Sequence, residues 1–232
     1  MVNPLGAKGA AAEAAIARLS LEGLPALEFL ERAAVPFRRA MPYGAGCWKT
    51  VDPQTLLWTG FGIEDGGTGT IAAARWRFTE NELLEPDYGK DRDLARRRIP
   101  VSTLHRETHG EPGRSARYRL IHQTFGLGAE LRAAFRTGEA TWGLVALMRG
   151  HDEPDFSDKE IAFVARIGEH LGYGLRDALL REQAAADHVQ AVYAKLGVAS
   201  RAELSARLFY ENVVPQLGYQ QLREFGRAEL TS

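Results

Sequence analysis

The hydrophobic positions between residues 10 and 40 repeat with the period of an α-helix. Apolar side chains such as Leu30 and Ala34 recur every three or four residues, and charged side chains occupy positions between them. Gly23 and Pro25 interrupt the pattern, and proline suits the first turn of a helix far better than its interior. The pattern therefore predicts two helices that are separated near these two residues.

Two later stretches favour β-hairpins. Residues 46–62 hold strand-forming side chains on either side of residues 52–55, Asp-Pro-Gln-Thr, which is typical turn chemistry. Residues 129–137 and 139–149 alternate apolar and polar positions on either side of Gly138. Each strand of this second hairpin has one apolar face, so we expect an antiparallel sheet that is covered on at least one side.

Helical periodicity returns between the hairpins. Apolar residues recur at helical spacing over 71–84 and over 114–125, and the Gly-rich residues 65–70 are expected to form a loop. Residues 99–104 favour a short strand between the two helices. Pro100 places this strand near a sheet edge or at its own start, because proline cannot donate to the hydrogen-bond ladder.

Two capping boxes mark helix starts in the last third of the chain. Ser157 and Glu160 are spaced to satisfy each other's free backbone donors, so we expect a helix there whose apolar stripe extends toward Leu196. A stripe of this length usually packs against another helix or another chain. Gly197 ends this helix, and Ser200 begins the next one.

Composition and charge narrow the classes of function. The 232 residues are 45% hydrophobic and 25% charged, which fits one large or two small globular domains. The net charge of -1 creates no overall attraction to nucleic acid or anionic lipid. Cys47 is the only cysteine, which excludes an internal disulfide and a cysteine-based zinc site. No apolar run reaches about 18 residues and no signal peptide is evident, so we expect a cytoplasmic protein without a membrane partner.

Four segments together resemble the GAF-like sensor region of actinobacterial LuxR-type transcriptional regulators. They read CWKTVDPQTLLWTG, VSTLHRETHG, GLGAELRAAFRTGEATWGLVALMRG and FSDKEIAFVARIGEHLGYGLRDALL, and the resemblance spans residues 24–180. It implies an α+β fold, with a GAF-like central antiparallel sheet flanked by helices and a small molecule bound between sheet and helices. We therefore expect a sensor domain with N-terminal helices over residues 1–180, followed by a helical C-terminal arm over 181–232.

The segment DHVQAVYAKLGVASRAELSARLF is similar to the end of a LuxR-type helix-turn-helix domain. The resemblance implies DNA-binding roles for His188, Gln190, Lys195 and Arg201. A complete motif needs about twenty residues for two helices and their turn, yet only three alanines precede this segment after Gln183. Acidic residues match the basic ones throughout the arm, which leaves little electrostatic affinity for phosphates. We therefore expect a truncated helix-turn-helix with impaired DNA binding.

Several motifs invite catalytic or metal chemistry, and each has a simpler interpretation. Residues 67–72 have the spacing of a dinucleotide-binding turn but lack the parallel strand-helix-strand unit that it needs. His105 and His109 do not form a zinc-protease motif, because Arg106 stands where glutamate is required. Cys47 lies in an apparent strand, where cysteine usually behaves as a small buried hydrophobe. We predict a protein that is not an enzyme and has no catalytic residue, metal or cofactor.

Aromatic side chains give the best indication of a ligand pocket. Large rigid side chains on strands often line small-molecule cavities, although plain core packing is the alternative interpretation. On this basis Trp48, Trp58, His122 and Trp142 are predicted to bind the ligand. The basic run 96–98 is interpreted as a solvated loop, with contact to an acidic partner or nucleic acid as the alternative.

These expectations combine into a ligand-sensing transcriptional regulator of the LuxR type. The ligand is expected to bias the long helix after Ser157, which sets the geometry of a homodimer, or of a heterodimer with a full-length relative, and so places the C-terminal helices. The regulator is expected to act by binding DNA. The alternative is an interaction protein that does not bind DNA but dimerises with full-length regulators and modulates them.

Overall fold

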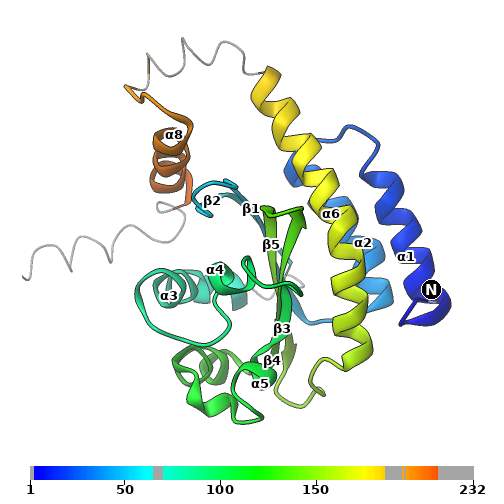
Figure 1. The fold of residues 1–232 in the computed structure, drawn as a ribbon. Helices are drawn as coiled ribbons and strands as arrows, with labels where there is room; N and C mark the ends of the chain where they lie inside the picture. Colours follow the sequence, from blue (N-terminus) through cyan, green and yellow to red (C-terminus); the bar gives the residue numbers. More distant parts are fainter. Residues whose placement is uncertain (1–2, 65–69, 186–194, 196, 214–232) are drawn as a thin grey trace, which may run out of the picture.

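A five-stranded antiparallel sheet with helices on both faces forms the centre of the molecule (Figure 1). The computed structural model describes residues 3–64, 70–185, 195 and 197–213. The strands follow the order β2-β1-β5-β4-β3. Their bounds are β1 Ala45–Val51, β2 Trp58–Glu64, β3 Val101–Thr103, β4 Leu127–Thr137 and β5 Ala140–Gly150. The expected fold class, an α+β fold with a central antiparallel sheet and a C-terminal helix, is confirmed.

Both predicted hairpins are present, and they pair with each other through β1 and β5. Trp48 stands opposite Gly62 on one side and Val145 on the other, so the two hairpins form one continuous sheet. Gly138 turns the second hairpin with φ +60°, a left-handed backbone conformation that glycine adopts without strain. The short strand β3 pairs with β4 at the sheet edge, where the sequence placed it.

Three helices lie over one face of the sheet, which we call the helical face; two of them pack against the strands, and the first along the chain packs against those two (Figure 1). They are α1 Gly6–Leu19, α2 Ala26–Ala40 and α6 Asp158–Ala185. The predicted break near Gly23 separates α1 from α2. The capping box at the start of α6 is also present, because the Ser157 backbone N–H donates to Glu160 Oε2 over 2.7 Å. Of the predicted extension from residue 186 to Leu196, all but Lys195 lies outside the described part of the chain.

Glycines let α6 lie unusually close to the sheet. A Cβ at Gly172 would lie 2.4 Å from the backbone oxygen of Arg136 in β4, whereas a Cβ at Gly168 would meet only Phe135, at 3.7 Å. A real Cβ does not approach another atom as closely as 2.4 Å.

Although α6 has 28 residues, neither it nor any other helix in the described ranges is apolar over a length that crosses a bilayer.

One longer helix and several short elements cover the opposite face of the sheet, which we call the charged face. They are α3 Thr70–Leu84, α4 Asp91–Leu94, α5 Leu104–Glu107, η1 Pro112–Arg114, η2 Tyr118–His122 and η3 Gln123–Phe125. The helix predicted over 114–125 is present over residues 116–125, but it includes the π-helical turn η2 and ends with the 3-10 turn η3. Side chains take up the backbone donors at its start, since Arg117 N–H donates to Asp87 and Tyr118 N–H donates to Ser115. The donors of a first helical turn have no partner within the helix, so these contacts cap its start.

The strands of the second hairpin are buried on both faces, beyond the one apolar face that alternation indicates. Leu131 and Phe135 face the helices, while Glu130 and Arg132, at the alternate positions, are buried on the charged face. Their charges are paired there with other buried charges. In this sheet, these polar positions of an alternating strand are therefore buried like the apolar ones.

The C-terminal arm packs against the end of the sheet next to β2 (Figure 1). The elements of its described part beyond α6 are α8 Arg201–Leu208 and η4 Phe209–Val213. The predicted capping box is present, because Ser200 Oγ accepts from Glu203 N–H over 3.1 Å. The ring of Phe209 is only 4% exposed and lies 6.2 Å from the ring of Trp58. The arm is therefore docked through an inserted aromatic side chain.

Candidate functional site

Two of the predicted ligand-binding residues belong to the core beneath the helical face. Trp48 is 2% exposed, packs between the rings of Phe37 and Phe135, and donates its indole N–H to Glu64 over 2.7 Å. Trp142 lies in the same core and donates to Thr137 Oγ1 over 2.7 Å. Both indoles thus have satisfied donors within packed surroundings.

The other two predicted ligand-binding residues lie on the charged face. Trp58 packs against Phe209 and beneath the ammonium group of Lys49, which is 4.5 Å from its ring centre. His122 is buried against the rings of Phe78 and Tyr118. The four predicted residues therefore do not share one cavity, and none of them lines either of the two larger hollows described below. Their role in ligand binding stays a prediction.

The predicted DNA-binding residues are only partly within the described chain. His188 and Gln190 lie outside the described residues, and Lys195 is exposed. Arg201 points back to the sheet, where its Nε is 3.1 Å from Oδ2 of Asp52. Arg201, a predicted DNA contact, therefore forms an ion pair within the chain itself.

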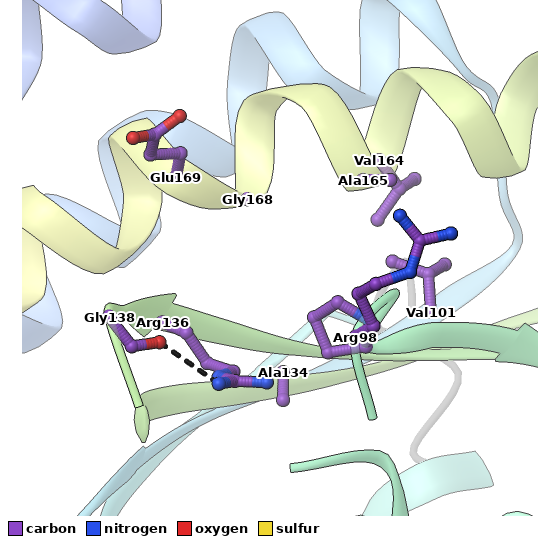
Figure 2. A pocket seen from close by; sticks show the side chains of 10 residues that line it. Arg98, Val101, Ala134, Arg136, Gly138, Val164, Ala165, Gly168 and Glu169 are labelled. Atoms are coloured by element: carbon purple, nitrogen blue, oxygen red, sulfur yellow. Dashed lines mark hydrogen bonds between the residues drawn. The ribbon is translucent and has the colours of Figure 1, made fainter. Parts of the chain in front are cut away.

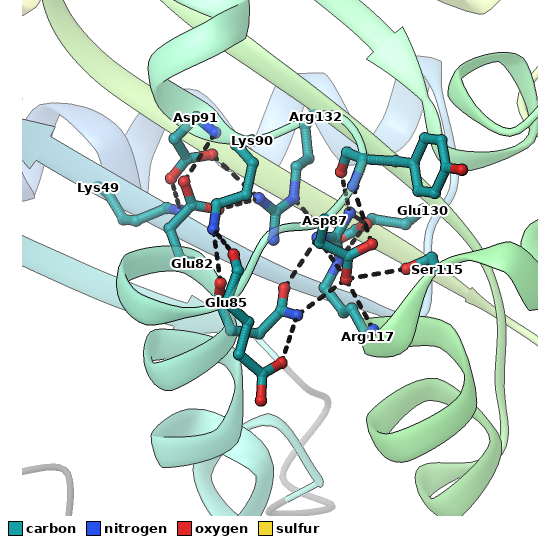
Figure 3. A network of polar contacts seen from close by, with 12 residues as sticks. Lys49, Glu82, Glu85, Asp87, Lys90, Asp91, Ser115, Arg117, Glu130 and Arg132 are labelled. Atoms are coloured by element: carbon teal, nitrogen blue, oxygen red, sulfur yellow. Dashed lines mark hydrogen bonds and ion pairs between the residues drawn. The ribbon is translucent and has the colours of Figure 1, made fainter.

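A cluster of buried charges is the largest polar feature of the charged face (Figure 3). The charged cluster comprises Lys49, Glu82, Asp87, Lys90, Asp91, Arg117, Glu130 and Arg132. Arg117 Nε and Arg132 Nε each lie 2.9 Å from a different oxygen of Glu130. Arg132 also reaches Glu82 over 2.6 Å, and Lys49 pairs with Asp91. The cluster thus ties α3 and α4 to β1 and β4.

The electrostatics of the cluster keep its central carboxylate ionised. Burial would raise the pKa of Glu130, but the guanidinium groups of Arg117 and Arg132 hold that pKa well below its usual range. Burial and the neighbouring charge of Asp91 raise the pKa of Glu82. Because the acids and bases satisfy one another at short distances, the cluster fits a structural role that fixes the helices to the sheet.

His122 borders the charged cluster without a hydrogen bond to any described residue. Its side chain is fully buried, and its Nε2 lies 3.9 Å from Oε1 of Glu130, beyond hydrogen-bond reach. Burial lowers the pKa of His122 to about 4, against the opposing influence of Glu130. The imidazole is therefore neutral at physiological pH.

A cleft of about 400 Å³ separates α8 from the rest of the molecule. We call it the arm cleft. Its walls come from the start of α2, from β1 and β2, from the end of α6 and from α8, and they are mainly apolar. They include Leu27, Val51, Leu179, Leu204 and Leu208. A volume of this size and a mostly apolar lining are typical of small-molecule sites.

Fixed polar groups stand at the ends of the arm cleft. Oδ1 of Asp52 accepts from Thr55 N–H over 2.9 Å, which aims Oδ2 at Arg201. Glu182 Oε1 accepts from Ala26 N–H over 2.7 Å and so satisfies a free donor at the start of α2. Few and well-oriented polar groups in an apolar hollow are what give such sites their specificity.

Sequence reasoning missed the arm cleft, because its walls come from segments far apart in the chain. The one available signal was the turn at residues 52–55, whose aspartate was recognised as turn chemistry but not as an inward-facing carboxylate.

Neither the models of known protein families nor the curated proteins compared with this chain match it. The geometry of the cleft therefore carries the functional argument.

Proposed function

We propose that the protein is a ligand-sensing regulator whose small molecule binds in the arm cleft and controls the docking of the C-terminal arm. The observation that carries this proposal is that α8 forms one wall of the cleft while α2, α6 and the sheet form the others. A molecule that touches both walls binds the docked arrangement better than the undocked one. By mass action it therefore stabilises the docked arm.

The lining of the cleft defines the class of ligand. Leucine and valine side chains suit an apolar body, and Arg201, which is partly exposed beside the buried Asp52, offers a hydrogen-bond donor. A ligand with an uncharged, largely apolar body and one polar group fits this arrangement. Such a molecule need not disrupt the ion pair, because it can accept a hydrogen bond from the partly exposed guanidinium of Arg201 beside it.

The output that we propose is regulation of transcription in the cytoplasm, in keeping with the resemblance to LuxR-type regulators. α6 is the element that would carry the signal to a second subunit. Its end lines the cleft through Leu179, and Tyr173 and Leu180 are 44% and 41% exposed along its outer side. A dimer formed through this helix would couple ligand binding to the position of both arms.

Native mass spectrometry of the purified protein tests the proposal. We expect a co-purifying small molecule in the wild type and in Leu120→Trp, a control with a bulky residue at an exposed site outside the cleft. Leu204→Trp, which fills the cleft, is expected to lose that molecule. Retention of the same molecule by Leu204→Trp would show that it binds elsewhere and would count against the proposal.

A second candidate function is an interaction protein that modulates full-length regulators without contacting DNA. The ion pair between Arg201 and Asp52 favours it, because it engages a predicted DNA contact within the chain itself. Retention on genomic DNA fragments distinguishes the two functions. Binding by the purified protein alone supports a direct regulator, whereas binding only in the presence of a full-length relative supports the interaction protein.

A further inference from the structure

A second hollow lies where the edge of the sheet meets α6, well away from the arm cleft (Figure 2). We call it the edge notch, and its volume is about 280 Å³. It exists because β3 is only three residues long, so its pairing with β4 ends at Ala133. Ala134 N–H still donates to the Pro100 oxygen over 2.8 Å, and beyond this point α6 faces the sheet edge across the notch.

Two arginines from different segments enter the edge notch. Arg136 is held in place by carbonyl groups, since its Nη1 donates to the Arg97 oxygen over 2.6 Å and its Nη2 to the Gly138 oxygen over 2.9 Å. Carbonyl groups orient a guanidinium but do not neutralise its charge. The Nε of Arg136 is buried and has no hydrogen-bond partner within the described ranges. Arg136 is therefore a fixed cation, and no acid of the described residues forms an ion pair with it.

The second arginine, Arg98, precedes β3 and reaches from the sheet edge toward Val164 and Ala165 on α6 (Figure 2). No hydrogen bond or ion pair joins its side chain to another residue of the described structure. The one acid that lines the notch, Glu169, lies further along α6 and forms no ion pair with a described residue. The lining therefore carries two cations against one anion, an excess of positive charge.

The rest of the lining is apolar. Pro100 and Val101 come from the sheet edge, Val164 and Ala165 come from α6, and Gly168 leaves the helix surface open at this point. A hollow that is lined by both apolar side chains and guanidinium groups suits a molecule with two unlike parts. Guanidinium binds carboxylate and phosphate through charge-assisted hydrogen bonds, while the apolar wall excludes water from the body of the ligand.

We propose that the edge notch binds a small organic anion, with a carboxylate or phosphate group on an apolar body. This site goes beyond the proposed function, because it shares no lining residue with the arm cleft and takes a ligand of different charge. Its occupant lies against Ala165 of α6, so it binds the same helix that we expect to connect the two subunits.

Calorimetric titration with 1-naphthoate, 1-naphthyl phosphate and the neutral 1-naphthamide tests the proposal. At least one of the two anions is expected to bind about tenfold or more tightly than the amide, because a charge-assisted hydrogen bond is about twice as strong as a neutral one. The preferred anion distinguishes a carboxylate ligand from a phosphate ligand. Equal affinity for all three probes, or no binding of either anion, would overturn the proposal.

Variants locate the binding of the anion. Arg98→Gln is expected to abolish the preference for the anion, whereas Arg96→Gln, which removes an exposed charge outside the notch, is expected to keep it. Ala165→Phe fills the notch and is expected to block all three probes. Leu204→Trp, which fills the arm cleft, is expected to leave anion binding unchanged. Anion binding that survives Arg98→Gln and Ala165→Phe, or that is lost in Leu204→Trp, would contradict the proposal without affecting the proposed function.

Discussion

Nε of Arg201, in the first turn of α8, lies 3.1 Å from Oδ2 of Asp52, in the turn between β1 and β2. The carboxylate is only 1% exposed and is oriented by its own turn, through the backbone N–H groups of Gln54 and Thr55. The sheet therefore presents a pre-formed docking point for the arm. This ion pair and the inserted ring of Phe209 are the two contacts on which our account of the arm depends.

Loss of the ion pair should loosen the arm without unfolding the protein. In Arg201→Gln we expect faster amide hydrogen exchange over residues 201–213. The free energy of global unfolding should change by less than about 1 kcal/mol, because Arg201 is partly exposed. Lys195→Gln removes an exposed cation nearby and serves as the control. Identical exchange in the two variants would mean that the pair does not hold the arm.

Loss of the aromatic insertion should have a larger effect on the arm. Phe209→Ala removes a ring that is 4% exposed, and burial of such a ring is worth about 3 kcal/mol or more. We expect undocking, which exposes Trp58 and moves tryptophan emission to longer wavelength. Tyr210→Ala, a change to the neighbouring 64% exposed ring, should shift the emission much less. Equal shifts in both variants would argue against the insertion.

The buried imidazole of His122 should make the fold sensitive to mild acid. Its pKa is about 4 in the folded protein against 6.5 for the ordinary group, so protons bind the unfolded chain more readily. The free energy of unfolding therefore has its full value, as far as His122 is concerned, above pH 6.5, and it decreases as the pH falls toward 4. Relative to His122→Phe, the wild type should lose about 2 kcal/mol of unfolding free energy between pH 7 and pH 5. Urea titrations of both proteins at both pH values measure this difference, and parallel pH profiles would contradict it.

The charged cluster should tolerate the loss of its central acid poorly. Glu130→Gln leaves Arg117 and Arg132 without their shared carboxylate, and breaking a buried pair costs about 3–5 kcal/mol. Urea unfolding should show this loss, while Glu111→Gln, a change at an exposed position, should stay close to the wild type. A loss below about 1 kcal/mol for Glu130→Gln would mean that the cluster does not hold the helices to the sheet.

Two glycines one turn apart on α6 should respond differently to substitution by alanine. Gly172→Ala places a Cβ against the backbone of Arg136 and should destabilise the fold by about 2 kcal/mol or more. Gly168→Ala meets only an ordinary contact with Phe135 and should be neutral or stabilising by up to about 1 kcal/mol, because alanine favours the helix. Thermal unfolding compares the two. Similar melting temperatures would show that α6 does not approach β4 this closely.

Local sequence signals predicted much of the fold. Both hairpins and both capping boxes depend on residues within a few positions of each other, such as Ser157 and Glu160, so the sequence alone was enough to place them. The charged cluster was not predicted, because its pairs join distant segments. Arg132 and Glu82, for example, are 50 residues apart. In an alternating strand, Arg132 has the same appearance as a solvent-exposed residue.

The candidate site was predictable only in outline. Aromatic residues indicated a pocket, but Trp48 and Trp142 pack in the core, and the larger hollows are lined by leucines and arginines instead. The arm cleft exists because Phe209 inserts beside Trp58, a contact between segments that no local pattern connects. Helical periodicity indicated that α8 would form, but not what it would pack against.

The most direct test of the account is hydrogen exchange over residues 201–213 with and without N-phenyl-1-naphthylamine, a neutral apolar fluorescent probe of suitable size for the arm cleft. If an apolar molecule binds between α8 and the sheet, saturation with the probe slows exchange of this segment in the wild type and has no effect in Leu204→Trp. Exchange that is unchanged in the saturated wild type, or equally slowed in Leu204→Trp, would contradict ligand control of the arm.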